Sequence, residues 1–196
     1  MEKINFIKTF IPEGQYRQKY EYGNMVVYHI NAEYNKEMNA YECYECTLPK
    51  AIFDETKVRS AFAQFSAKMD ALKLEEAKAE KIAEIAAYDT SDKVNGFILN
   101  GLLVWLDKAT RVGLMNSTTI AKAAGQQTTT LWLGGLKLVV DCDKAIQLLS
   151  ALEMYALECF NVTASHKQAI SELTSLEDVE VYDYKAGYPK MLEMSV

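Results

Sequence analysis

Four cysteines and two histidines are the residues best suited to chemistry. Cys43 and Cys46 form a CxxC pair, whereas Cys142 and Cys159 stand apart. A redox pair needs the N-terminus of a helix in a thioredoxin-like unit, because that position lowers the thiol pKa. Residues 41–48 alternate like a strand, which directs the two thiols to opposite faces. We therefore expect reduced cysteines with a packing role, and keep redox catalysis as an alternative.

Metal and nucleophile chemistry also lack a recognisable pattern. A zinc site would have to add His29 or His166 to the cysteines, and the spacing matches no zinc knuckle. Neither histidine accompanies a nucleophile elbow or a phosphate-binding glycine loop. The acidic side chains between residues 172 and 183 lack the alternation of a calcium loop. We expect no catalytic residues, no cofactor and no metal; an enzyme or metal-binding module is the least favoured class.

Composition and charge favour a folded protein with protein partners. The chain has 196 residues, 49% of them hydrophobic and 24% charged, with a net charge of −6. Residues 141–196 hold ten acidic and four basic side chains, which accounts for all of that charge. Nucleic-acid binding requires clustered Lys and Arg, so we expect no nucleic-acid partner. We also expect no membrane partner, because no leader and no long apolar run is present.

The N-terminal region has the pattern of a β-hairpin over residues 20–48, with strands at 25–30 and 41–48. It is rich in tyrosine, including Tyr28, Tyr41 and Tyr44. Tyrosine supplies rigid contact area for a partner, and it also favours ordinary sheet packing. Both interpretations remain open at this point.

A long helix is predicted next, capped by Asp54 and running to about residue 88. Its apolar side chains step by four and three at Val58, Phe62, Phe65, Met69 and Leu72, and the register continues through alanines to residue 86. This is heptad spacing, which suits a coiled coil between two parts of the protein. A helix packed on its own chain would show the same pattern.

The C-terminal region predicts two hairpins and two helices. Asn100-Gly101 and Gly134-Gly135 are turn pairs between apolar segments, and Asp107 is a suitable cap for a helix over residues 108–124. A last helix should run from about residue 142 to 173, followed by a tyrosine-rich tail without a strong period. The predicted class is α+β: an N-terminal β-hairpin unit, a long connecting helix, and a C-terminal domain of two hairpins packed with helices. The predicted division is 1–52, 53–88 and 89–196.

From about Ala79 to the C-terminus the sequence resembles the domain of unknown function that ends many phage and prophage tail proteins, including tail-fibre-associated ones. The resemblance depends on Ile85-Ala86-Ala87-Tyr88-Asp89, the Phe97 strand, Trp105-Leu106-Asp107 with Arg111, the Trp132 strand, the helix from Tyr155 to His166-Lys167, Tyr182-Asp183 and Gly187-Tyr188-Pro189. Residues before 79 resemble a leading segment of such proteins in gut Bacteroidales. Trp105, Asp107 and Arg111 are compatible with a functional surface, although capping and an ion pair would also explain the last two.

The resemblance implies a non-enzymatic virion protein, made in the bacterial host's cytoplasm and incorporated in the tail or its appendages. Its expected partners are other virion proteins and further copies of itself. A tail-fibre assembly chaperone, absent from the mature particle, is the main alternative. The candidate protein-interaction residues are Tyr28, Tyr41, Tyr44, Phe62, Phe65, Met69, Trp105, Arg111 and Trp132.

Overall fold

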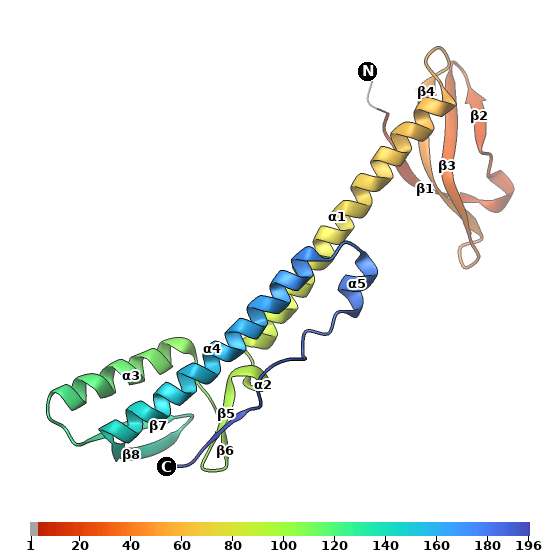
Figure 1. Ribbon diagram of the computed structural model, residues 1–196. Coiled ribbons are helices and arrows are strands. Elements are labelled where there is room, and N and C mark those ends of the chain that lie inside the picture. Colours follow the sequence, from red (N-terminus) through yellow and green to blue (C-terminus); the bar gives the residue numbers. More distant parts are fainter. Residues whose placement is uncertain (1–3) are drawn as a thin grey trace. The chain divides into compact units, whose positions relative to one another are not determined.

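The computed structural model describes residues 4–196 and confirms the α+β class (Figure 1). The elements are β1 (Ile7–Pro12), a 3-10 turn (Glu13–Gln15), β2 (Lys19–Tyr22), β3 (Met25–Asn35), β4 (Ala40–Pro49), α1 (Glu55–Asp89), α2 (Asp92–Asn95), β5 (Gly96–Leu99), β6 (Leu102–Trp105), α3 (Lys108–Ala123), β7 (Thr128–Leu133), β8 (Leu136–Asp141), α4 (Cys142–Glu172), α5 (Leu176–Val181) and β9 (Leu192–Met194). Two compact units comprise Met1–Lys73 and Leu74–Val196. We refer to them as the N-terminal and C-terminal units.

The N-terminal unit contains a four-stranded antiparallel sheet in the order β1-β4-β3-β2. The predicted hairpin corresponds to β3 and β4, and the sheet adds β1 and β2 at its edges. β2 joins β3 through a tight turn in which Gly23 has a φ of +57°, a conformation that glycine adopts without strain. The two edge strands were not predicted, because β2 is exposed along its whole length and β1 ends in proline.

One face of this sheet packs against the first part of α1. Its buried cluster is Tyr28, Ile30, Cys46, Val58 and Phe62. The Phe62 ring lies 5.2 Å from the ring of Phe6 and 5.2 Å from that of Tyr44, within the range of favourable aromatic pairs. The sheet and the helix therefore share one largely aromatic core.

Helix α1 begins as predicted. The backbone N–H groups of Thr56 and Lys57 donate to Asp54 Oδ1 at 3.0 and 3.2 Å, which makes Asp54 an N-terminal cap. Val58 and Phe62 are buried against the chain's own sheet. The early part of the heptad stripe is therefore already in use within the chain.

The second part of α1 packs through a different face. Ala79 and Ala83, which continue the predicted heptad, are exposed, whereas Ile85 is fully buried. Lys78 Nζ donates to the carbonyl of Ser171 at 3.1 Å, so this part of α1 lies beside α4 (Figure 1). The face of α1 that packs within the chain therefore changes along the helix, and the boundary between the two compact units falls between Lys73 and Leu74.

Both predicted C-terminal hairpins form. Asn100 and Gly101 have φ values of 50° and 81°, and Gly134 and Gly135 have 58° and 86°, as type I′ turns require. The hairpins belong to separate sheets, β6-β5-β9 and β7-β8. The unpredicted strand β9 pairs in parallel with β5. The helices α3 and α4 match the predicted ones closely.

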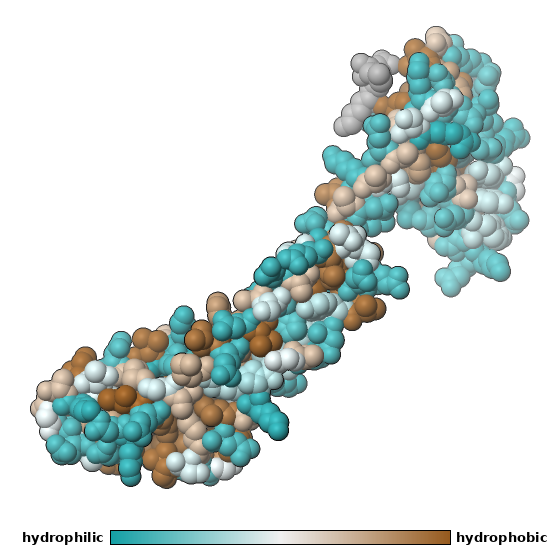
Figure 2. All heavy atoms as spheres, viewed as in Figure 1, coloured by the Kyte–Doolittle hydropathy of each residue, from teal (hydrophilic) through white to brown (hydrophobic). Residues whose placement is uncertain are grey.

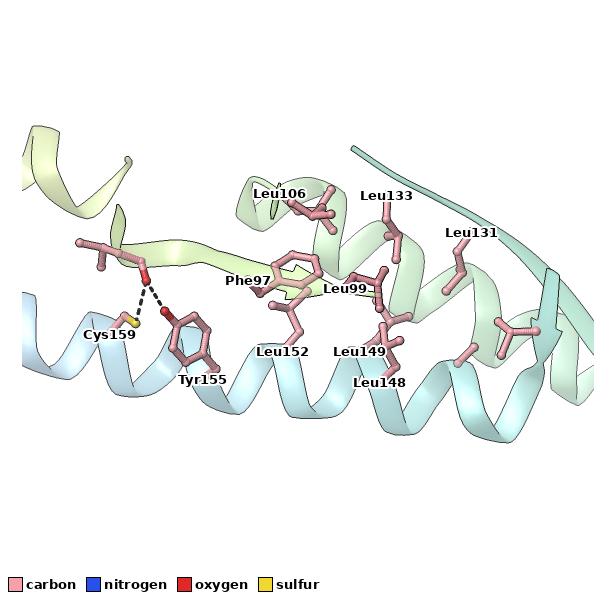
Figure 3. Close-up of a cluster of buried hydrophobic side chains, with 14 residues drawn as sticks. Phe97, Leu99, Leu106, Leu131, Leu133, Leu148, Leu149, Leu152, Tyr155 and Cys159 are labelled. Atoms are coloured by element: carbon pink, nitrogen blue, oxygen red, sulfur yellow. Dashed lines mark hydrogen bonds between the residues drawn. The ribbon is translucent and has the colours of Figure 1, made fainter. Parts of the chain in front are cut away.

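The C-terminal core is mainly aliphatic and lies along one face of α4 (Figure 3). Its 14 buried residues include Phe97, Leu99, Leu133, Leu149 and Leu152. At one end of this core, Tyr155 Oη and Cys159 Sγ approach one carbonyl oxygen, that of Val94, at 2.7 and 3.2 Å. These contacts satisfy polar groups that would otherwise be costly to bury.

Candidate functional site

A pocket of about 410 Å³ opens on the C-terminal unit, between β6, the start of α3 and the middle of α4. It is lined by Asp89, Thr90, Asn95, Trp105, Leu106, Asp107, Lys108, Arg111, Glu153, Ala156, Leu157 and Phe160. All of these residues belong to one compact unit. Its volume lies within the range typical of ligand pockets.

Arg111 lies beneath this pocket and is only 8% exposed. Its Nε donates to Glu153 Oε1 at 2.8 Å, and its Nη1 donates to the carbonyl of Leu106 at 2.7 Å. Burying a guanidinium requires such compensation, since an unpaired buried charge is strongly destabilising. The two bonds hold the side chain in one orientation between α3 and α4.

Asp107 caps α3. The ion pair between Asp107 and Arg111 that their spacing allowed does not form, because Arg111 pairs with Glu153. Thr110 donates to Asp107 through its backbone N–H at 2.9 Å and through its hydroxyl at 2.6 Å. These hydrogen bonds lower the pKa of the Asp107 carboxyl. The cap starts the helix at Lys108 and so places Arg111 one turn later, facing Glu153.

The pocket walls are apolar and accessible. Trp105, Leu157 and Phe160 are 40%, 49% and 61% exposed. Figure 2 shows apolar atoms interspersed with polar ones on the surface of this unit. Large exposed apolar side chains grouped around a recess are typical of interaction sites. The arrangement can therefore bind an apolar group at its walls and a hydrogen-bond acceptor at its floor.

The structure separates the remaining candidate residues. Tyr28 and Phe62 are buried in the N-terminal core, so neither side chain is accessible to a partner in the folded chain. Tyr44, Phe65 and Met69 are half-buried, and the first two pack against the same core.

Tyr41 and Trp132 lie elsewhere. The ring of Tyr41 stacks on Tyr16 with centroids 4.2 Å apart, on the sheet face opposite Tyr44. Trp132 is exposed on β7 and does not line the pocket. Of the predicted interaction residues, Trp105 and Arg111 are the two that line the pocket.

The CxxC cysteines are buried on opposite faces of the N-terminal sheet. Cys46 belongs to the cluster that faces α1, whereas Cys43 lies near Tyr16. Burial raises the pKa of the Cys46 thiol to about 11, and that of Cys43 in the same direction. A thiol with a raised pKa is a poor nucleophile at neutral pH. All four cysteines are free.

The two histidines hold neighbouring segments together. His29 is buried, with Nδ1 2.5 Å from the carbonyl of Arg17 and Nε2 3.1 Å from Glu45 Oε2. His166 contacts the hydroxyl of Tyr182 at 2.8 Å and the carbonyl of Ala186 at 2.9 Å. Within residues 4–196, no group of three His, Cys, Asp or Glu side chains is placed to hold a metal ion.

Several residues of the family resemblance secure the C-terminal tail. Thr163 Oγ1 donates to Asp89 Oδ1 at 2.7 Å and lies 2.8 Å from the hydroxyl of Tyr188. Together with the contacts of His166, these bonds join the end of α1, α4 and the tail. These hydrogen bonds within the chain are sufficient to explain why Asp89, Thr163, His166 and Tyr188 occur at these positions.

Sequence reasoning missed Glu153, Leu157 and Phe160 as members of the site. Phe160 follows the buried Cys159 in α4 and is itself exposed. One signal was available: Met154, Leu157 and Phe160 give α4 more apolar residues than a single buried stripe needs.

None of the helices that the structure describes has the length and apolar character to span a membrane.

Comparison with known proteins supports the C-terminal resemblance at the level of the domain. A family model described as Domain of unknown function (DUF4376) matches residues 76–186, which contain every residue that lines the pocket. No curated protein and no solved structure matched the chain. The match covers more than half of the 196 residues. The chain therefore belongs to the family of unknown function DUF4376.

Proposed function

We propose that this protein is a non-enzymatic structural component of a phage or prophage tail, or of a tail appendage, and acts through protein–protein contacts. The context of the proposal comes from the resemblance of the C-terminal domain to domains that end phage tail proteins. The observation that carries the contact role is the group of exposed apolar side chains around Arg111: Trp105, Leu157 and Phe160.

Physical arguments favour a protein as the partner. Aromatic and arginine side chains in a recess are the residues that most often dominate binding energy at protein interfaces. The acidic excess of residues 141–196 opposes binding to a phosphate backbone. A protein surface with apolar side chains does not meet this repulsion.

Quantitative mass spectrometry of purified particles tests the proposal. Particles induced from the source strain should contain this chain in a fixed ratio to the major tail proteins. Its absence from particles, with recovery in a complex from the lysate, would instead favour the assembly chaperone. Absence from both would contradict the proposed role.

The proposal includes a symmetric homo-oligomer, because repeated structural components assemble with closed symmetry. Val58 and Phe62 pack within the chain, so we expect copies to associate through surfaces other than these α1 residues. Light scattering of the purified protein at high concentration measures the mass. A strictly monomeric protein would contradict this part of the proposal.

A further inference from the structure

We infer that the pocket around Arg111 binds an extended polypeptide segment of a partner protein, which inserts one large apolar side chain and gives one main-chain carbonyl to Arg111. The inference rests on the proposed function, because it identifies the surface and the chemistry of that contact. We call this pocket the Arg111 groove, comprising Trp105, Arg111, Glu153, Leu157 and Phe160 with their neighbours.

The floor of the groove offers an unused hydrogen-bond donor. Nε and Nη1 of Arg111 have partners, whereas Nη2 has none among residues 4–196. Thr118 Oγ1 is the one enclosed side-chain polar atom without a partner in that part of the chain. Nη2 is therefore not fully enclosed, and the residue that carries it lines the groove. A donor already fixed in orientation binds an acceptor with little further loss of freedom.

The walls provide the apolar half of the site. Trp105 comes from the end of β6, whereas Leu157 and Phe160 project from adjacent turns of α4. All three side chains are more than a third exposed, so a partner that covers them removes apolar area from water. A large aliphatic or aromatic side chain has the matching chemistry.

Charge in the groove selects the acceptor and the flanking residues. Asp89, Asp107 and Glu153 supply three negative charges, whereas Lys108 and Arg111 supply two positive ones. The guanidinium is already paired with Glu153, so a second carboxylate would meet like charge. A neutral carbonyl is the better acceptor for Nη2, and a Lys or Arg next to the inserted side chain complements the net negative rim.

Photo-crosslinking identifies the occupant directly. The substitution Leu157→p-benzoylphenylalanine places a photoreactive group in the groove wall of the full chain, expressed in the strain that forms the particles. The control is Val139→p-benzoylphenylalanine, because Val139 is exposed on β8 outside the groove. We expect the first variant alone to crosslink to one particle protein, at a segment with a large apolar residue, a neighbouring Lys or Arg and no acidic neighbour.

A pair of conventional variants measures the contribution of the walls. Leu157→Ser with Phe160→Ser should lower the yield of the partner complex by about tenfold or more, as loss of an interface anchor does. Val139→Ser should leave that yield unchanged. Both changes concern exposed side chains, and thermal unfolding of each variant confirms that the fold is retained.

The outcomes separate this inference from the proposed function. If the wild-type chain is in particles and the groove variants incorporate equally, the inference is wrong and the proposed function stands. A crosslink to an acidic segment or to glycan would also overturn the inference. If the wild-type chain is missing from particles but crosslinks in cells to an apolar, basic segment of a tail protein, the groove is supported and the structural role is not.

Discussion

The two units use aromatic side chains in opposite ways. In the N-terminal unit the rings of Phe6, Tyr44 and Phe62 fill the space between the sheet and the first part of α1. In the C-terminal unit an aliphatic core lies along one face of α4, while Trp105 and Phe160 remain exposed. The difference lies in coverage: a helix of the chain covers the N-terminal rings, whereas the side chains of Trp105 and Phe160 stay 40% and 61% exposed.

This comparison shows how aromatic content should be interpreted. The tyrosine-rich N-terminal segment suggested a docking surface, yet several of its rings serve the internal core. Aromatic residues are equally suited to cores and to interfaces, because both reward large buried area. The decisive observation is whether another element of the same chain lies over them. On that criterion the Arg111 groove is the stronger candidate surface.

The largest expected effect separates two phenylalanines. Phe62→Ala should destabilise the N-terminal unit by about 3–5 kcal/mol, because it removes a buried ring and leaves a cavity. Phe160→Ala should change stability by less than about 0.5 kcal/mol, since the ring is exposed. Calorimetric unfolding of the full chain measures both. Similar losses for the two variants would refute the contrast between the units.

The second prediction concerns the floor of the groove. Arg111→Met should cost about 1.5–3 kcal/mol of stability, because the Leu106 carbonyl and the Glu153 carboxylate both lose their hydrogen bonds. Glu153→Gln is the matched control, since its amide oxygen can still accept from Nε, and it should cost less. Denaturant unfolding monitored by circular dichroism compares them. An equal loss for both variants would mean that charge, rather than hydrogen bonding, holds Arg111.

Most regular elements could be predicted because their signals are local. Turn pairs such as Asn100-Gly101 and caps such as Asp54 and Asp107 act within a few residues, and each performs the predicted role. Edge strands depend on partners elsewhere in the chain. β9 has three residues and pairs with β5, which lies far earlier in the sequence. No local pattern could reveal that pairing.

The candidate site was predictable only in part, for the same reason. Trp105 and Arg111 are close in sequence and were singled out through the resemblance. Glu153 and Leu157 join them because α3 packs against α4, a contact between residues about 40 positions apart, as the Arg111–Glu153 separation of 42 shows. Spacing along one helix carries no information about which neighbouring helix it meets. The ion pair therefore required the structure.

A third prediction tests the tightness of the C-terminal core. Thr118 is fully buried in α3, and its hydroxyl has no partner among residues 4–196. Thr118→Val keeps the shape of the side chain and removes this unsatisfied group, so we expect a gain of about 1 kcal/mol. Thr119→Val is the control, because Thr119 is exposed and should show no such gain. A loss of stability on Thr118→Val would mean that the hydroxyl has a partner in solution.

The smallest expected effect is a pH dependence that each unit should show separately. The pKa of Asp107 is lowered from 3.8 by hydrogen bonds from Thr110, and that of Glu55 is lowered from 4.5 by hydrogen bonds from Arg59 and Tyr28. A carboxyl whose pKa is lower in the folded state stabilises the protein above its unfolded pKa, and this contribution is lost as pH falls through the folded value. Acidification below about pH 5 should therefore lower the Tm of both units. Asp107→Asn should flatten this slope for the C-terminal unit only, and Glu55→Gln for the N-terminal unit only; a flattening of both slopes by one substitution would show that the units unfold together.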